Sequence, residues 1–171
     1  MPKKKKKEPL PKIKRKILKL WSEKVRSSTG NRCAICGMQA GDYYNGVKQK
    51  IDAHHIEEKT TCANLRYDPL NGIPLCVRHH KWGKDAVHNS LIFFADWLKE
   101  NRPLQYEYVK NNRKKIIDLN NREVLEEKLE QMVKPFTEEE LKILNIHEFY
   151  KELNSIERKP DYQFFNLWEQ D

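Results

Sequence analysis

The residues best suited to chemistry lie between positions 33 and 80 of the 171-residue chain. Two pairs of potential metal ligands frame this segment, and each pair leaves two residues between its members: Cys33 and Cys36, then Cys76 and His79. This spacing lets a tight turn present both side chains to one tetrahedral ion. The cysteine-framed block from Asn31 to about Asn101 has about 70 residues. A hydrophobic core of this size is marginal for stability, and a structural metal commonly reinforces it. We therefore expect a structural zinc site here.

The neighbouring residues His79 and His80 leave open which imidazole faces that zinc ion. Helical geometry favours His79, because it lies three residues after Cys76, whereas His80 is rotated by about 100° toward the other side. Neutral imidazole is a good zinc ligand, so a histidine in the fourth position is compatible with the site. His80 is then available for a second role.

Two adjacent histidines and an asparagine, His54, His55 and Asn71, lie between the outer pairs, and a purely structural zinc site does not need them. On a strand, Asp52 and His54 would share one face and His55 would turn to the other or begin the loop. One imidazole could then bind a divalent cation while the other takes a proton from water. Asn71 could hold the loop that carries the base and fix its tautomer through a hydrogen bond. These roles suit hydrolysis of a phosphodiester.

Residues 33–88 resemble the HNH endonucleases, which are the ββα-metal nuclease family. The family pattern is a Cys pair, Asp/His-His-Ile, Asn and Cys-x-x-Cys-His, and this chain has Cys33/Cys36, His54-His55-Ile56, Asn71 and Cys76-x-x-His79-His80. The one departure is a histidine at the fourth zinc position, where the family more often has cysteine. The resemblance covers about a third of the chain, and residues 79–103 are also similar to small phage and bacterial HNH proteins.

The resemblance implies a metal-dependent endonuclease that hydrolyses DNA. It implies that His55 is the general base, that His54 and His80 bind the catalytic ion, and that Asn71 orients the loop. It also implies that the structural Zn²⁺ is bound by Cys33, Cys36, Cys76 and His79. The catalytic ion would be Mg²⁺, which is abundant in cells, or Mn²⁺, Co²⁺ or Ni²⁺, which histidine ligands tolerate.

Two further residues could take part in the metal site. His88 could add a ligand or a phosphate contact, but it could equally cap or pack. Asp52 could accept a hydrogen bond and orient an imidazole. Cys62 is left over, either as a buried small hydrophobic residue or as an alternative ligand.

The net charge of +8 is concentrated near the N-terminus, because residues 1–30 contain twelve Lys or Arg and only two Glu. We expect this basic arm to contact DNA phosphates with an affinity that falls steeply with salt. A solubilising tail or a nuclear localisation signal would have the same composition. The candidate nucleic-acid contacts are Lys3, Lys4, Lys5, Lys6, Lys7, Lys14, Arg15, Arg78, Lys81 and Lys84, although a solvated helix face would also explain the last three.

The expected fold is α+β, with a small zinc-stabilised ββα-metal (HNH) unit between an N-terminal amphipathic helix and C-terminal helices. The expected divisions are a disordered basic arm at 1–12, a nuclease domain at 13–103 and a helical extension at 104–171. Asn71-Gly72 is a turn signal, and Thr137 to Glu140 is a capping box. The predicted strands are 47–54 and 73–76, and the predicted helices are 13–26, 79–87, 91–98, 104–118, 122–133 and 141–150.

Cysteines in metal-type spacing, no apolar stretch near about 18 residues and no signal-peptide pattern favour a cytoplasmic protein without a membrane contact. The resemblance to phage and bacterial HNH proteins implies that the cell is a bacterium or a phage-infected host. One alternative function is a non-catalytic, zinc-stabilised nucleic-acid-binding or phage assembly module, for which His55→Ala would have no effect. Another is a helical interaction protein whose C-terminal helices bind a protein partner. The aromatic residues at 164, 165 and 168 need cover from the domain or from such a partner.

Overall fold

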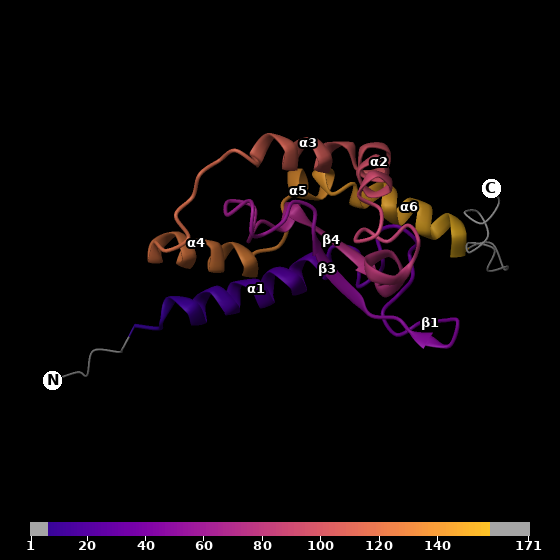
Figure 1. The fold of residues 1–171 in the computed structure, drawn as a ribbon, viewed down its shortest axis with the longest axis horizontal. Helices are drawn as coiled ribbons and strands as arrows, with labels where there is room; N and C mark the ends of the chain where they lie inside the picture. The colour runs from indigo at the N-terminus through magenta and orange to yellow at the C-terminus, as the bar shows by residue number, and fades with distance from the viewer. Residues whose placement is uncertain (1–6, 158–171) are drawn as a thin grey trace.

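The computed structural model describes residues 7–157, and the predictions for Lys3 to Lys6 and for the aromatic residues after position 157 lie outside this part of the chain. Helices and two small antiparallel sheets make up the fold, which is the α+β class expected (Figure 1). None of the described helices is both long and apolar enough to cross a membrane. In chain order the elements are α1 (Leu10–Ser27), β1 (Tyr43–Tyr44), β2 (Val47–Lys48), β3 (Ile51–His55), the 3₁₀ turn η1 (Pro69–Asn71), β4 (Gly72–Cys76), the π-helical turn η2 (Arg78–Trp82), α2 (Leu91–Asn101), α3 (Pro103–Asn112), α4 (Arg122–Val133), α5 (Glu138–Ile143) and α6 (Ile146–Glu157).

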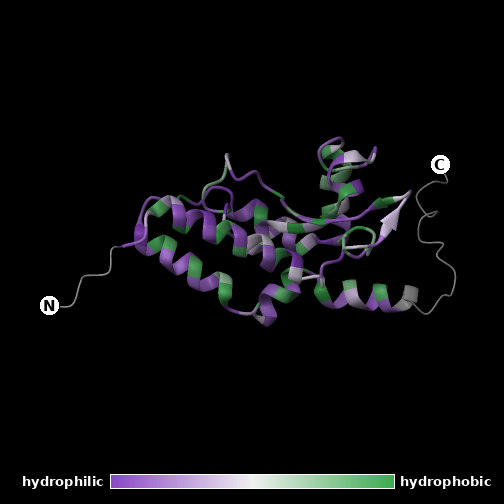
Figure 2. Ribbon diagram, turned by 90° about the horizontal axis from the view of Figure 1, so that it is seen from below, coloured by the Kyte–Doolittle hydropathy of each residue, from purple (hydrophilic) through white to green (hydrophobic). Residues whose placement is uncertain are grey.

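Helix α1 is amphipathic, and its buried residues recur every four positions: Ile13, Ile17, Trp21 and Val25. This face packs on the β3–β4 sheet and on α4, which runs alongside α1 in both views (Figures 1 and 2). The helix begins at Leu10, so the end of the predicted disordered arm is helical instead. Proline is tolerated in the first turn because its missing N–H would have no partner there, which allows Pro11 in this helix.

Strands β3 and β4 pair antiparallel from Ile51 opposite Cys76 to His55 opposite Gly72. The strand predicted at 47–54 is wrong in its bounds, because it breaks at positions 49 and 50 into β2 and β3. Gln49 is buried there and bonds to the preceding loop, with its N–H donating to the Asp42 carbonyl at 2.7 Å. The first half of the predicted strand therefore forms a separate hairpin, β1–β2.

The turn predicted at Asn71-Gly72 lies earlier in the chain, at η1. Asn71 ends η1, and Gly72 is already the first residue of β4 with an extended backbone. A Cβ atom on Gly72 would lie 2.2 Å from Cγ2 of Val25 and 3.0 Å from Cζ2 of Trp21. The glycine is therefore needed for the close approach of α1 to the sheet and not for a turn.

Two predicted helices are shorter than expected. The helix at 79–87 is the single turn η2, which ends where the Gly83 N–H donates to the Arg78 carbonyl at 2.8 Å. The helix at 104–118 ends at Asn112, and the following segment crosses to α4 and buries Leu119 against the α1 cluster. Burial of that leucine outweighs the local helical pattern.

The capping box is confirmed, since Thr137 Oγ1 accepts the Glu140 N–H and Glu140 Oε2 accepts the Thr137 N–H. The helix predicted at 141–150 is instead two helices, α5 and α6. They are separated by Asn145, whose φ is +53°, while Leu144 and Ile146 pack on Leu70.

Candidate functional site

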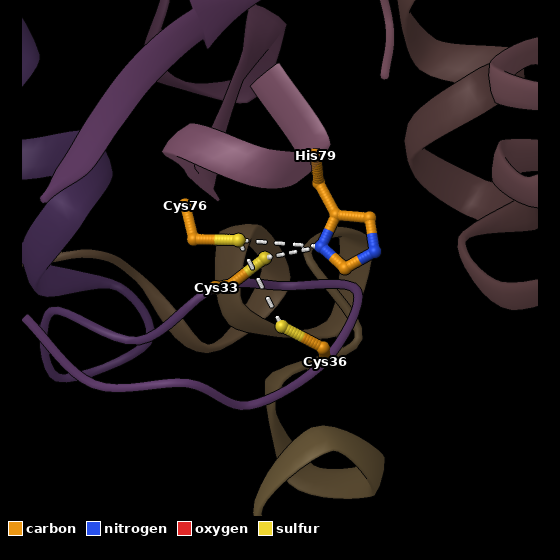
Figure 3. A group of neighbouring side chains, drawn as sticks. All are labelled: Cys33, Cys36, Cys76 and His79. Atoms are coloured by element: carbon orange, nitrogen blue, oxygen red, sulfur yellow. Dashed lines mark hydrogen bonds between the residues drawn. The ribbon is translucent and has the colours of Figure 1, made fainter. Parts of the chain in front are cut away.

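Three cysteines and one histidine meet where a loop, the end of β4 and η2 come together (Figure 3). The loop folds back through Gly37, whose φ is +69° and whose N–H donates to the Cys33 carbonyl at 2.9 Å. Cys76 is the last residue of β4, and His79 follows on η2. The two ligand pairs predicted from the sequence, Cys33 with Cys36 and Cys76 with His79, therefore lie together in the structure.

The distances in this cluster fit a tetrahedral zinc ion. Nδ1 of His79 lies 3.6 Å from Sγ of Cys33 and 3.3 Å from Sγ of Cys76. The sulfur atoms of Cys36 and Cys76 are 3.9 Å apart. Zn–S bonds of about 2.3 Å would place two tetrahedral sulfur ligands about 3.8 Å apart. The group could therefore hold zinc without rearrangement of the side chains.

The pKa values of the Cys33 and Cys36 thiols shift in opposite directions. The pKa of Cys36 is raised, because its thiol is hydrogen-bonded to the sulfurs of Cys33 and Cys76 and is itself buried. Burial also raises the pKa of Cys33, but hydrogen bonds from its two neighbours outweigh that and leave it well below its ordinary value. A bound cation would favour the ionisation of all three thiols, so zinc binding would release protons.

Three histidines form a second group that could hold a metal: His54 from β3, His80 from η2 and His88 from the loop before α2. Their potential ligand atoms lie within 4.8 Å of one another. The structure thus brings His88 beside the two histidines that the sequence predicts as ligands. His54 and His80 are partly buried, whereas His88 is exposed.

The imidazoles of His54 and His80 favour the neutral form, which is the form that binds metals. Burial, aided by the neighbouring imidazoles, lowers the pKa of His54 to about 3. Burial also lowers the pKa of His80, although a hydrogen bond with Asp52 opposes the shift. Nδ1 of His80 lies 3.0 Å from Oδ2 of Asp52, which leaves Nε2 with the lone pair for a metal. Asp52 therefore orients an imidazole and is outside both metal groups found in the described residues.

His55 faces away from this group, as the alternation along a strand predicts. Its imidazole stacks on Trp21, with 3.8 Å between ring centroids and 10° between planes. Nε2 of His55 lies 2.9 Å from the backbone carbonyl oxygen of Arg66. A carbonyl can only accept, so Nε2 carries the hydrogen and Nδ1 of the neutral ring keeps its lone pair. Burial lowers the pKa of His55, and the bond to Arg66 partly opposes this.

Asn71 is fully buried and holds both ends of the loop between β3 and η1. Its Oδ1 accepts the Glu57 N–H at 2.8 Å, and its Nδ2 donates to the carbonyls of Glu57 at 2.9 Å and Leu65 at 3.1 Å. The loop-holding role expected of Asn71 is therefore present. The hydrogen bond that sets the tautomer of His55 comes instead from Arg66, the residue after Leu65.

The sequence did not reveal Trp21 or Arg66 as parts of this site. Trp21 matched the apolar pattern of α1 and nothing distinguished it from its neighbours on that face. The contribution of Arg66 is a backbone carbonyl, which leaves no trace in the residue type. The apolar pattern of α1 could have predicted that Trp21 is buried on the inner face of the helix, but not that its ring stacks on His55.

The predicted basic residues occupy two places. Arg78 and Lys81 lie on η2, which also carries His80 of the three-histidine group, and the Arg78 guanidinium lies 5.0 Å from the centre of the Tyr44 ring. Lys84 and Lys7 are exposed. Arg15 is exposed in the N-terminal half of α1, where the Lys14 ammonium donates to Oδ1 of Asn120 at 2.9 Å.

Cys62 is buried and lies outside both metal groups of the described chain. Its thiol donates to the Arg113 carbonyl at 3.1 Å, and it packs with Leu65 and Val109. This position agrees with the expectation that Cys62 is a buried small hydrophobic residue.

No protein-family model, curated protein or solved structure matches the chain.

Proposed function

We propose that this protein is a metal-dependent endonuclease of the HNH type, which hydrolyses DNA phosphodiester bonds in the cytoplasm of a bacterium or of a phage-infected cell. The observation that carries the proposal is the environment of His55. Its imidazole is stacked on Trp21, its Nε2 is engaged by a carbonyl, and it directly follows His54 of the three-histidine group. A structural zinc unit alone requires none of these features.

His55 is built as a base for water. With Nε2 donating to the Arg66 carbonyl, the lone pair of Nδ1 can accept a proton from an attacking water. The same carbonyl then stabilises the imidazolium that forms, because it accepts a hydrogen bond from a charged donor. Stacking on Trp21 restricts rotation of the ring, which keeps Nδ1 in one direction.

The three-histidine group would hold a divalent ion through His54, His80 and His88. Such an ion acts as a Lewis acid that stabilises negative charge on a scissile phosphate and its leaving oxygen. The ion would be Mg²⁺, which is abundant in cells, or Mn²⁺, Co²⁺ or Ni²⁺, which histidine ligands tolerate. The role of the protein is to orient these imidazole rings. Asp52 orients the ring of His80 through its contact with Nδ1.

The cysteine cluster would hold Zn²⁺ and stabilise the elements that carry the candidate site. It connects the 33–36 loop to β4 and η2, the elements that carry Cys76, His79 and His80. The Ala34 N–H also donates to the Pro74 carbonyl at 2.8 Å, which joins the loop to the sheet. Zinc at this position would therefore determine where His80 lies.

The test is cleavage of supercoiled plasmid by the zinc-loaded wild type, by His55→Ala and by His147→Ala, with Mg²⁺, with Mn²⁺ and without added divalent ion. His147 is an exposed histidine on α6 and serves as the matched control. We expect metal-dependent nicking or linearisation by the wild type and the control, and a loss of at least about a hundredfold in His55→Ala. Equal cutting by His55→Ala would contradict the role of the base.

Mn²⁺ binding separates chemistry from metal affinity. We expect His55→Ala to bind Mn²⁺ like the wild type and His80→Ala to bind it weakly, as measured by electron paramagnetic resonance of the free ion. If no form of the protein cuts DNA while the wild type binds it and retains one zinc, the non-catalytic nucleic-acid-binding function replaces this proposal.

A further inference from the structure

A cleft of about 330 Å³ lies between the β1–β2 hairpin and η2. Tyr44, Val47, Arg78 and Trp82 line it, and Tyr43 is exposed on the same hairpin. We call these five residues the aromatic surface. The hairpin labelled β1 projects at one end of the fold in Figure 1, away from the α1–α4 pair.

The aromatic surface exposes an unusual amount of large apolar side chain. The exposed fraction is 71% for Trp82, 68% for Tyr43 and 43% for Val47. Tryptophan is on average a highly buried residue, so a mainly exposed one needs an explanation. Neither Trp82 nor Tyr43 belongs to any of the hydrophobic clusters of the described residues.

The backbone under Trp82 is held rather than free. The Gly83 N–H donates to the Arg78 carbonyl, and Asn89 Nδ2 donates to the carbonyls of Gly83 at 2.8 Å and Lys81 at 3.2 Å. A Cβ atom on Gly83 would lie only 2.9 Å from the Arg78 carbonyl oxygen, so this tight closure requires glycine. Across the cleft, the Arg78 guanidinium lies over the Tyr44 ring. The fold thus presents the indole on a closed turn beside a second ring.

The charges around the aromatic surface favour a polyanion. Lys48 and Lys50 follow Val47 in the chain, and Lys81 and Lys84 flank Trp82, all four with exposed side chains. Of the carboxylates nearby, that of Asp42 accepts the Gln39 N–H at 2.8 Å, and that of Asp52 lies 4.0 Å from the Lys81 ammonium. The combination of exposed rings with interleaved Lys and Arg is typical of surfaces that bind single-stranded nucleic acid, where bases stack on rings and phosphates meet cations.

We propose that the aromatic surface binds unpaired bases of DNA, with one base stacked on Trp82. This rests on the proposed function and narrows its substrate to DNA that contains a single-stranded segment, such as a branch or flap. In a duplex the faces of the bases are covered by their neighbours, so an exposed indole has a stacking partner only where bases are unpaired. Trp82 and His80 both lie on the short element η2, so the aromatic surface and the three-histidine group are connected by a single turn of the chain.

The test measures equilibrium binding, by fluorescence anisotropy without added divalent ion, of a labelled 20-nucleotide single strand and of a blunt duplex of equal length. The proteins are the zinc-loaded wild type, Trp82→Ala, Trp82→Phe and Val133→Ala. Val133 is 70% exposed at the end of α4 and controls for loss of an exposed apolar side chain elsewhere. Thermal melting checks that each variant is folded.

We expect Trp82→Ala to weaken single-strand binding about tenfold while duplex binding changes less than about twofold. Trp82→Phe should retain most of the affinity, because a phenyl ring still offers a face for stacking, and Val133→Ala should match the wild type. Unchanged single-strand affinity in Trp82→Ala would overturn the proposal and leave the surface as a contact for a protein. An equal loss for both DNA forms would also overturn it.

This outcome is independent of cleavage. If the wild type fails to cut any DNA but binds the single strand through Trp82, the proposed nuclease function fails and the base-binding surface stands. If the wild type cuts and Trp82→Ala binds the single strand equally well, the nuclease stands and the base-binding surface fails.

Discussion

The indole of Trp21 and the imidazole of His55 are parallel within 10° and 3.8 Å apart at their centroids. Trp21 is held from a second direction, because its Nε1 donates to the Asp68 carbonyl at 2.8 Å. Gly72 lies directly opposite His55 in the sheet and leaves room for Trp21 and Val25 of α1. The position of a helix on the sheet therefore determines the surroundings of the candidate base.

Gly72→Ala should push α1 away from the sheet, because the new methyl group would overlap Val25. We expect the free energy of unfolding to fall by about 1–3 kcal/mol or more, as overpacking of a core does. Urea unfolding measures this. The double variant Gly72→Ala/Val25→Ala should recover part of the loss, so its destabilisation should be smaller than the sum of the two single changes. Strict additivity would show that the two sites do not meet.

Cys36→Ala should remove the structural zinc, whereas Cys62→Ala should keep it. Of these two cysteines, only Cys36 belongs to the group of four potential zinc ligands. The Cys62 thiol instead donates a hydrogen bond to the Arg113 carbonyl. We expect metal analysis to find about one zinc per chain in the wild type and in Cys62→Ala. Cys36→Ala should lose zinc and unfold at a much lower temperature, since structural zinc contributes roughly 10 kcal/mol or more of apparent binding free energy. Wild-type melting of Cys36→Ala would refute the zinc assignment.

Tyr108→Phe should destabilise the protein more at pH 8 than at pH 5. The Tyr108 hydroxyl donates to Oδ2 of Asp68 at 2.7 Å. Burial raises the pKa of Asp68, and this hydrogen bond lowers it, so the variant carries a still higher folded-state pKa. The native state then binds more protons than the unfolded state, and the free energy of unfolding falls as pH rises through that window.

The expected difference in the free energy of unfolding from wild type is about 1 kcal/mol at pH 5, and it grows to about 2–3 kcal/mol at pH 8 as the carboxylate ionises. Urea unfolding at the two pH values measures it, and the comparison with wild type cancels any common effect of pH on the zinc cluster. Tyr106→Phe, on the same helix α3, is the control and should show one small difference at both pH values. A pH-independent difference for Tyr108→Phe would contradict the assignment.

Several features follow from the sequence by itself because they depend on local geometry. Two-residue spacing within each pair of ligands is a property of a tight turn, so Cys33 with Cys36 and Cys76 with His79 could be paired before any fold was known. The alternation of a strand separates His54 from His55, the four-residue period identifies the buried face of α1, and the capping box locates the start of α5.

Element ends were predicted less well, because they depend on contacts that local periodicity does not contain. The pattern of residues 104–118 is helical, but burial of Leu119 against α1 ends α3 early. The break before β3 follows from the bonds of Gln49 to a loop, and the break after α5 from the packing of Leu144 on Leu70.

The surroundings of the candidate site depend on contacts between segments that are distant in the sequence. His88 could have packed or capped, and it joins His54 and His80 because the turn after η2 returns toward β3. Trp21 reaches His55 across more than thirty residues of chain, and the hydrogen bond to His55 comes from a carbonyl that every residue possesses. Residue types record which groups can do chemistry, but contacts between distant segments determine which of them meet.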